Sequence, residues 1–244
     1  MHKALISENK PMELSVVVLC YQSGALIRQF IRQLRDEIVP LNITFELILV
    51  ANYDAGVVDE TPLIAQEVAK ELTGCVVVSK SKEGKMGWDM KSGILCARGN
   101  YVAVIDGDGQ MPVSDIPAVY EIIKKGSFDL VKTFRAKRYD GVYRTTLSYF
   151  YNLVFRLLFN PDFPAKDINS KPKILTRKAI SQITLQSNDW FTDAEIMLEA
   201  NRLKLRICEI ATVFYRNERR SSFVRPGVIL EFTYNLIYYR LKSL

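Results

Sequence analysis

Two carboxylates lie one residue apart in the segment YVAVIDGDGQMP, at the end of an apolar run. Asp106 and Asp108 are separated and followed by glycines, which allow a tight turn and the close approach of a ligand. Carboxylate oxygens are the ligands that Mg²⁺ and Mn²⁺ prefer, and Gln110 adds another oxygen donor. The pattern predicts a divalent-metal site at Asp106, Asp108 and Gln110, where the ion would neutralise charge on a departing diphosphate.

The alternative for this segment is an acidic surface turn, because Asp and Gly are also ordinary turn residues. Two Asp residues with this spacing are frequent by chance. We favour a functional site because the pair directly follows a predicted strand that ends at Ile105.

Cations that could hold phosphate form a second group. They are Arg135, Lys137, Arg138 and Arg144, followed in later segments by Lys171, Lys173, Arg177, Arg216, Arg219 and Arg220. Planar guanidinium groups suit bidentate phosphate binding, so we predict phosphate contacts at Arg144 and Arg219. For any one of these cations, the alternative is an ordinary solvated surface position.

Asp193 and Glu195 form a third group, at the start of a predicted helix from Thr192 to Asn201. The N-terminus of a helix favours negative charge, so simple capping would also explain the pair. Side chains two residues apart on a helix diverge by about 200°, so the two carboxylates are not expected to face the same substrate.

The elements that must position these groups follow an alternating pattern of apolar runs rich in Val and Ile and longer stretches with helical spacing. The predicted strands are Leu14 to Cys20, Phe45 to Ala51, Cys75 to Ser79, Tyr101 to Ile105 and Leu130 to Phe134. The predicted helices are Ala25 to Ile38, Asp59 to Leu72, Gly87 to Ala97 and Ser114 to Lys124. This order predicts an α/β fold with a Rossmann-like, mostly parallel central sheet, helices on both faces and ligands at the carboxyl ends of strands.

Two more helical segments, Tyr143 to Phe159 and residues 227–244, are rich in aromatic side chains. They could pack on the sheet. They could also lie in a membrane interface, where Tyr and Phe sit at the headgroup level and cations meet anionic lipid. The N-terminal segment has no apolar stretch suited to a secretory signal, and no apolar run reaches the roughly 18 residues of a spanning helix.

Composition sets the wider limits. The 244 residues suit one domain at 13–223, between a flexible N-terminus at 1–12 and a C-terminal amphipathic helix at 224–244. A net charge of +6 suits an anionic partner but does not identify it. The four cysteines have no CxxC spacing and lie in apolar stretches, so we expect reduced core thiols and a cytoplasmic chain, associated with the inner face of the membrane.

Several segments match one family in order. GKMGWDMKSGILCARGNYVAVIDGDGQ has its Gly-Lys-Gly, Ala-Arg-Gly and Asp-Ala-Asp-x-Gln spacing, and DINSKPKILTR follows its Asp-x-x-Ser-Gly-Phe-x-x-x-x-Arg segment. NDWFTDAEIMLEA matches Trp-Phe-x-Asp-x-Glu-Ile, and RNERRSSF falls where the family has an Arg- and Ser-bearing segment. From about Leu14 to Phe223 the sequence therefore resembles the inverting glycosyltransferases of family 2, the GT-A fold group that includes dolichyl- and polyprenyl-phosphate sugar synthases.

The sequence departs from the family pattern at three places. In LSVVVLCYQSGALI, Tyr21 matches but the polar-acidic set after it is replaced. Ala51 and Asn52 occupy the positions of an Asp pair that helps to hold the nucleotide. Lys171 and Pro172 stand in place of Gly-Phe, which puts an extra cation where the family has an aromatic residue.

The resemblance implies a role for each matched residue. It implies donor contacts at Tyr21, Asn52, Lys85, Asp106, Gln110 and Arg219, an acceptor-phosphate contact at Asp167, and Mg²⁺ or Mn²⁺ at the acidic turn. We add Arg144, for its guanidinium group, and Lys171, the extra cation, as acceptor-phosphate contacts. It also implies an acid-base role for Asp193 near the acceptor, and we assign Glu195 to its support.

The expected function is inverting transfer of a sugar from a nucleotide-diphosphate sugar to a polyprenyl phosphate at the membrane surface. One alternative is the same donor chemistry with a saccharide hydroxyl as acceptor. Another is a binding module for nucleotide sugars or nucleic acid without transfer activity, although no recognised nucleic-acid motif is present and we expect no such partner.

Overall fold

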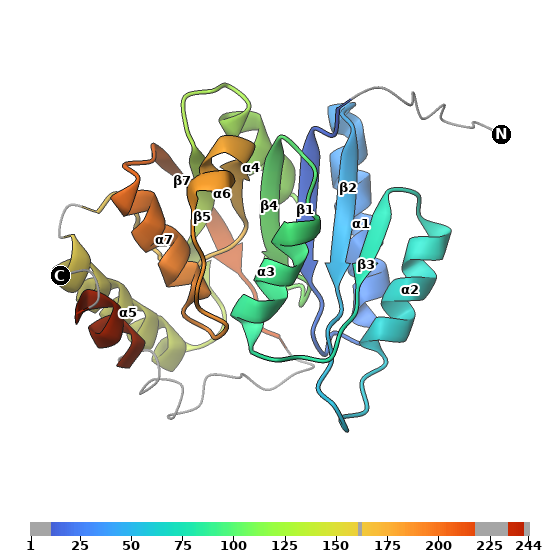
Figure 1. Cartoon of the computed structure of the whole chain (residues 1–244), viewed down its shortest axis with the longest axis horizontal. Coiled ribbons are helices and arrows are strands. Elements are labelled where there is room, and N and C mark those ends of the chain that lie inside the picture. The colour runs from blue at the N-terminus through green and yellow to red at the C-terminus, as the bar shows by residue number, and fades with distance from the viewer. Residues whose placement is uncertain (1–10, 161–162, 218–233, 242–244) are drawn as a thin grey trace.

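The computed structural model describes residues 11–160, 163–217 and 234–241, and a seven-stranded sheet forms its centre (Figure 1). The strands are β1 (Leu14–Leu19), β2 (Phe45–Val50), β3 (Cys75–Val78), β4 (Tyr101–Asp106), β5 (Leu130–Arg138), β6 (Lys173–Thr176) and β7 (Ile207–Phe214). Their order across the sheet is β3-β2-β1-β4-β6-β5-β7. Only β6 runs antiparallel to its neighbours, so the predicted mostly parallel α/β sheet is confirmed.

The order of the strands reverses beside β1. The chain passes from β1 to β2 and β3 in one direction and then returns to place β4 on the other side of β1. In open α/β sheets, ligands bind outside the carboxyl ends of the strands at such a switch point. Tyr21 follows β1 and Asp106 ends β4, so two of the predicted site residues lie at this position.

Helices cover both faces of the sheet, as predicted. One face carries α1 (Leu26–Ile38), α2 (Thr61–Glu71) and α4 (Asp115–Ile123), with the short 3-10 helix η1 (Val39–Leu41) after α1. The other carries α3 (Met86–Cys96), α5 (Val142–Phe159), α6 (Arg177–Gln182) and α7 (Thr192–Arg202), together with helical residues 234–241.

The apolar strands form these two layers because successive side chains of a strand point to opposite faces. In β1, Val16 and Val18 belong to the core beneath α1, whereas Val17 and Leu19 belong to the core beneath α3 and α7. A strand buried on both faces has no polar side to expose, which explains the continuous apolar runs in the sequence.

Two strands, β6 and β7, were not predicted from the sequence. β6 has only four residues and begins with Lys173, which is 1% exposed, so its apolar run is too short to recognise. β7 contains Glu209, whose carboxylate pairs with the buried ammonium of Lys132 on β5 at 2.9 Å. A charged residue inside a strand breaks the apolar pattern from which strands are predicted, and its partner in a distant segment cannot be recognised from the sequence.

Both aromatic helices pack on the domain through one side. Phe155 of α5 is 1% exposed, and Leu236 is 2% exposed. The ring of Tyr239 lies 4.5 Å from that of Phe191, centroid to centroid, and its hydroxyl donates to Glu195 Oε1 at 3.0 Å. The remaining residues of the predicted C-terminal helix, and residues 1–10 of the predicted flexible terminus, lie outside the described residues.

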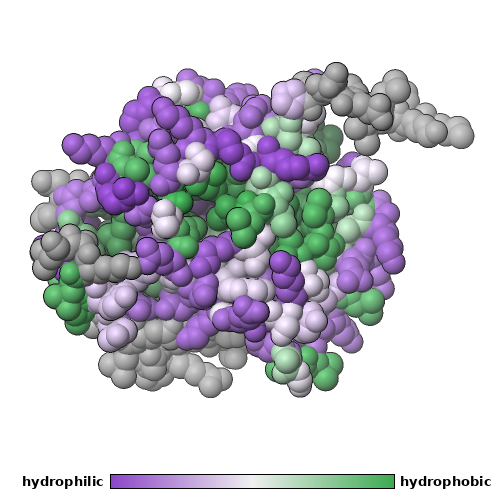
Figure 2. All heavy atoms as spheres, viewed as in Figure 1, coloured by the Kyte–Doolittle hydropathy of each residue, from purple (hydrophilic) through white to green (hydrophobic). Residues whose placement is uncertain are grey.

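The opposite sides of these helices remain exposed. On the face shown in Figure 2, apolar side chains reach the surface at the edge where residues 234–241 lie. The exposed large apolar residues of the two helices are Val142, Tyr143, Tyr149, Phe150, Leu153, Val154, Leu157, Tyr234, Ile237, Tyr238 and Leu241. Within the described ranges, no helix combines the length and the apolar character that crossing a bilayer requires.

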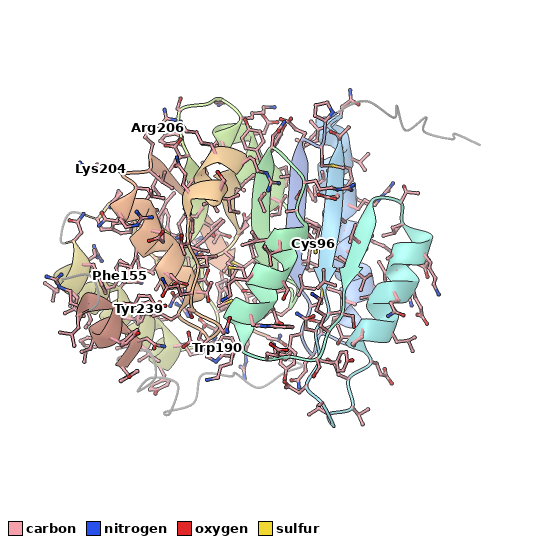
Figure 3. All side chains as sticks on the ribbon, viewed as in Figure 1. Cys96, Phe155, Trp190, Lys204, Arg206 and Tyr239 are labelled. Atoms are coloured by element: carbon pink, nitrogen blue, oxygen red, sulfur yellow. The ribbon has the colours of Figure 1, made fainter. Side chains whose placement is uncertain are left out.

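The cysteines are unpaired, in agreement with the prediction of reduced thiols. Cys20 is buried after β1, as expected for a core thiol. Cys96 is exposed at the end of α3, so the expectation of a core position is wrong there (Figure 3).

Candidate functional site

A cavity of about 810 Å³ opens at the carboxyl edge of the sheet. This volume lies within the range of pockets that bind cofactors and substrates. Its wall combines residues that follow β1 and β4, the start of α3, the start of α7 and one side of α5. Trp190, labelled near the lower edge of Figure 3, belongs to the same wall. The cavity has four parts of different chemistry.

The first part is the acidic turn that follows β4. Asp108 Oδ1 accepts a hydrogen bond from the Gln110 backbone N–H at 3.0 Å, and Gly109 adopts a positive φ of 73° that closes the turn. The Gln110 side chain donates to the carbonyl of Tyr215 at 2.9 Å, and the Tyr215 N–H donates back to the Gln110 carbonyl at 2.8 Å. The segment after β7 therefore fixes the turn, and Asp106, Asp108 and Gln110 all line the cavity.

The second part is a chain of buried charges beside this turn. The Lys171 ammonium lies 3.2 Å from Asp106 Oδ2 and 2.8 Å from Asp193 Oδ2. Lys173 donates to Asp193 Oδ1 at 2.5 Å. Burial opposes ionisation of Asp193, but the two ammonium groups outweigh it and hold the pKa of this carboxyl below its usual range. Burial lowers the pKa of Lys173 to about 7, against the attraction of Asp193.

The close contact between α3 and α7 brings Asp193 to the cavity. A Cβ atom on Gly87 would lie 1.9 Å from Thr192 Oγ1 and 2.6 Å from the Asp189 carbonyl, so only glycine permits this approach. Lys85, two residues before Gly87, lines the cavity, and its backbone N–H donates to the Asn188 carbonyl at 2.7 Å. The Gly-Lys segment of the sequence thus positions both α3 and α7.

The third part lies at the far side of β1 and is polar. The Lys82 ammonium lies 3.9 Å above the Tyr21 ring and pairs with Asp89, while the Tyr21 hydroxyl donates to Asp54. Tyr21, Asp54, Lys82 and Asp89 all line the cavity. Burial raises the pKa of Asp89 above its usual value, although Lys82 and Asn52 oppose this effect.

Asn52, a predicted donor contact, does not reach the cavity wall. It is 0% exposed, its Nδ2 donates to Asp89 Oδ1 at 2.8 Å, and its Oδ1 accepts from the Lys80 N–H at 2.9 Å. The side chain is therefore occupied in holding Asp89 and the chain after β3. A direct contact with a ligand would need both of these buried hydrogen bonds to break.

The fourth part is a group of guanidinium groups around the Phe214 ring. The guanidinium carbons of Arg135, Arg138 and Arg144 lie 5.3, 5.4 and 5.8 Å from the ring centroid. Asp140 pairs with Arg138 at 2.7 Å and with Arg144 at 3.2 Å. We call Arg135, Arg138, Arg144 and Arg216, which all line the cavity, the arginine group.

Asp167, a predicted acceptor-phosphate contact, lies behind this group and not on the wall. Its carboxylate accepts hydrogen bonds from Arg135 Nε at 2.6 Å and from Arg135 Nη2 at 2.7 Å. Burial opposes ionisation, yet Arg135 holds the pKa of Asp167 well below its usual range. Asp167 therefore holds the guanidinium of Arg135 in place, and its predicted contact with the acceptor phosphate stays a prediction.

Beyond the arginine group the wall becomes apolar. Its lining here comes from one side of α5 and from the C-terminal helical residues: Leu147, Phe150, Tyr151, Val154 and Leu236. The labelled Phe155 and Tyr239 mark these two helices at one end of the molecule in Figure 3. The cavity therefore combines charged groups with Phe150 and Val154, which also belong to the exposed apolar side of α5.

Glu195 does not line the cavity either. Its carboxylate accepts the Gln186 and Ser187 N–H groups at 2.8 and 3.0 Å, in addition to the Tyr239 hydroxyl. These contacts hold the loop before α7 in place, and the assignment of Glu195 to the support of Asp193 stays a prediction. The expected divergence of Asp193 and Glu195 on the helix is confirmed.

The acidic turn suits a divalent ion with a small protein ligand set. Among the residues that the structure describes, no three or more His, Cys, Asp or Glu side chains gather to hold a metal. Asp106 and Asp108 lie together on the cavity wall, and Mg²⁺ commonly binds through one or two carboxylates while substrate phosphates complete its shell. The donor set thus fits an ion that binds together with a phosphorylated ligand.

Most of the predicted site residues meet in one place. The cavity wall includes Tyr21, Lys85, Asp106, Asp108, Gln110, Arg144, Lys171 and Asp193. Arg219 lies outside the described residues. Sequence reasoning missed Lys82, Asp89 and Asp140, because each acts through a partner that only the fold brings near. The sequence alone contained one signal for Asp89, its place inside the matched Gly-Lys block.

Comparisons with known proteins agree with this architecture. The family model "Glycosyl transferase family 2" matches residues 15–189. A dolichyl-phosphate beta-glucosyltransferase of Dictyostelium discoideum is 26% identical over 230 residues, covering 85% of this chain and 69% of that protein. An undecaprenyl-phosphate 4-deoxy-4-formamido-L-arabinose transferase of Pseudomonas aeruginosa is 31% identical over 146 residues, covering 59% of this chain and 42% of that protein.

A solved structure shares the fold. Glucosyl-3-phosphoglycerate synthase from Mycobacterium tuberculosis, in complex with Mn²⁺, uridine diphosphate and phosphoglyceric acid, superimposes with a TM-score of 0.68 at 20% identity. The match covers 95% of this chain and 78% of that chain. The chain spans 38% to 69% of the length of several curated relatives that it matches. On the extent of the family match and the shared GT-A fold, this chain belongs to glycosyl transferase family 2.

Proposed function

We propose that the chain transfers a sugar, with inversion, from a nucleotide-diphosphate sugar to a polyprenyl phosphate at a membrane surface. The observation that carries this proposal is the continuity of one cavity, which joins the acidic turn to the arginine group and then to the apolar side of α5. These three parts correspond to the three chemical demands of the reaction: a diphosphate leaving group, an anionic acceptor and a long apolar chain.

The donor would lie on the side of the cavity near β1 and β4. Tyr21, Lys82 and Asp89 line this side of the cavity and would surround the base. Mg²⁺ or Mn²⁺ held by Asp106 and Asp108 would neutralise the charge that grows on the departing diphosphate. Lys85, on the same wall, would add a positive charge near the phosphates.

The acceptor phosphate would lie at the arginine group. Asp140 and Asp167 balance two of its four guanidinium charges, which leaves a positive surface for a phosphate. Phosphate monoesters have a second pKa of about 6, so this acceptor is already a nucleophile near neutral pH. Asp193, whose pKa is lowered below its usual range, is a weak base and suits an acceptor that needs no proton removed.

The exposed apolar sides of α5 and residues 234–241 would contact lipid. Phe150 and Val154 belong both to the cavity wall and to the exposed side of α5, so a polyprenyl chain would leave the cavity along this helix. Tyr and Phe are exposed on α5, and Tyr234 and Tyr238 on the C-terminal helical residues, as in segments that lie at the level of lipid headgroups.

The test is a transfer assay with matched acceptors. Purified protein with Mn²⁺ is incubated with labelled UDP-, GDP- and dTDP-sugars, and with either a short polyprenyl phosphate or the corresponding polyprenol. We expect label to enter the organic phase only with the phosphate, and Arg138→Gln to reduce the rate by at least about tenfold. Equal transfer to both acceptors, or no transfer with any donor, would refute the proposal.

A saccharide hydroxyl is the second candidate acceptor, favoured by one observation: the Asp193 carboxylate faces the cavity, where a general base would stand. A hydroxyl must lose its proton, whereas an ionised phosphate need not. Asp193→Asn should abolish transfer to a hydroxyl but leave most of the transfer to a lipid phosphate. Loss of transfer to a saccharide hydroxyl alone in this variant would show that Asp193 acts as a general base for that acceptor.

A further inference from the structure

Lys171 occupies an unusual position between the two reactive sides of the cavity. Its side chain is 5% exposed, and its ammonium touches Asp106 on the acidic turn and Asp193 on α7. It is also part of the cavity wall, so the ammonium is not sealed within the core. A lysine that merely stabilised the fold would not need to face a ligand cavity with carboxylates on both sides.

The two carboxylates differ in their need for this cation. Asp193 has a second ammonium partner, because Lys173 donates to its other oxygen at 2.5 Å. Among the described residues, the cation that pairs with Asp106 is Lys171. Lys171 therefore balances the charge of Asp106 on the acidic turn.

We infer that Lys171 is a donor-binding residue that shares Asp106 with the divalent ion and contributes its own positive charge to the diphosphate of the nucleotide sugar. The inference rests on the proposed function and deepens it. It also moves Lys171 from the acceptor-phosphate role expected from the sequence, because the arginine group lies around Phe214 and Lys171 is paired with the acidic turn.

Two effects of opposite sign follow from this arrangement. In the absence of nucleotide, the ammonium and the metal ion compete for Asp106 and repel each other, so Lys171 weakens metal binding. Once the diphosphate is bound, its negative charge attracts both cations, and Lys171 strengthens the complex. A lysine with a merely structural role would not affect the two ligands in opposite directions.

The experiment compares wild type, Lys171→Met and the control Lys124→Met, which removes a surface ammonium on the sheet face opposite α3 and α7. Binding of Mn²⁺ alone is measured by the electron paramagnetic resonance signal of the free ion at pH 6.5. Binding of UDP, GDP and dTDP is measured calorimetrically at saturating Mn²⁺. We expect Lys171→Met to bind Mn²⁺ about tenfold more tightly and the preferred nucleotide about tenfold more weakly, with no change in the control.

Lys171→Arg keeps the charge and should restore nucleotide affinity to within about threefold of wild type. Lys171→Gln provides a second neutral variant if the Met variant does not fold, as judged by circular dichroism. An unchanged or weaker Mn²⁺ affinity in the neutral variants, or an unchanged nucleotide affinity, would overturn the inference. The Mn²⁺ measurement needs no donor, so it remains decisive for Lys171 even if wild type binds no nucleotide, an outcome that would refute the proposed function instead.

Discussion

At the scale of single residues, the site depends on buried ions that are paired across distant segments. Asp193 has two lysine partners, and Lys132, fully buried on β5, is paired with Glu209 on β7. Removal of one partner from such a pair is costly, because it leaves a charge buried without compensation. The positions of these lysines are therefore tightly constrained by their partners.

Lys173 predicts a specific pH dependence of stability. Burial lowers its pKa to about 7 in the folded protein, whereas an ordinary lysine has a pKa of about 10.4. Between these values the unfolded chain binds more protons than the folded chain. The free energy of unfolding should therefore rise with pH across this window, by at most about 1.4 kcal/mol per pH unit for this one group.

Lys173→Met should lack this contribution. Urea unfolding at pH 7, 8 and 9 is expected to give a shallower rise in stability for the variant than for wild type, with Lys124→Met as control. The ammonium of Lys173 interacts with the charges of Asp193, Lys132 and Lys171. Both the substitution and the deprotonation of Lys173 therefore remove a charge from this buried cluster. Parallel profiles for Lys173→Met and wild type would show that Lys173 is protonated throughout this range.

At the scale of elements, α3 and α7 must approach closely to place Asp193. Gly87→Ala should disrupt this contact, because its Cβ would lie 1.9 Å from Thr192 Oγ1. Gly93→Ala is the matched control on the same helix, where the Cβ would lie 2.3 Å from Val17 Cγ1 on the sheet side. Both should cost about 1 to 3 kcal/mol of stability, the usual range for overpacking.

Only Gly87→Ala should also impair the site. We expect its transfer rate to fall at least about tenfold beyond that of Gly93→Ala, at temperatures where both variants are folded, because displaced catalytic groups are costly in rate. Thermal melting and the lipid-phosphate assay supply the two readouts. Equal loss of activity in both variants would mean that the contact between α3 and α7 serves stability alone.

The sequence predicted the elements whose side chains come from one continuous pattern. β1, β2, β4 and the helices between them have clear periodicity, and their predicted ends lie within a few residues of the observed ones. β6 was missed because it has only four residues and begins with Lys173, and β7 was missed because Glu209 interrupts its apolar pattern. For the same reason the acidic turn could be predicted from its own segment, whereas the pairing of Lys82 with Asp89 and the burial of Asn52 depend on contacts between segments.

At the scale of the whole molecule, one end presents apolar side chains to the surroundings, and this predicts binding to membranes. Leu157 on α5 is 68% exposed, and Leu63 on α2 is a comparable apolar residue, 62% exposed, on the opposite face of the sheet. Leu157→Asp should reduce cosedimentation with vesicles of anionic and neutral phospholipid, because it places a charge in the interface. Leu63→Asp should leave it unchanged.

Equal binding of both variants to vesicles would contradict the proposed membrane contact. Transfer to a short, water-soluble isoprenyl phosphate should be similar in Leu157→Asp and wild type. That comparison separates the loss of membrane contact from a defect in the cavity itself.

The central claim is that the acidic turn after β4 holds a divalent ion, which in turn holds the nucleotide diphosphate. Calorimetric titration of wild type and Asp108→Asn with UDP, GDP and dTDP, each with Mn²⁺ and with EDTA, tests it most directly. We expect chelation and Asp108→Asn each to weaken binding of the preferred nucleotide at least about tenfold. Chelation should have little further effect on the variant, because both changes remove the same interaction. If chelation leaves nucleotide affinity unchanged, or if Asp108→Asn lowers it equally with Mn²⁺ and with EDTA, the acidic turn does not hold the nucleotide through a metal ion.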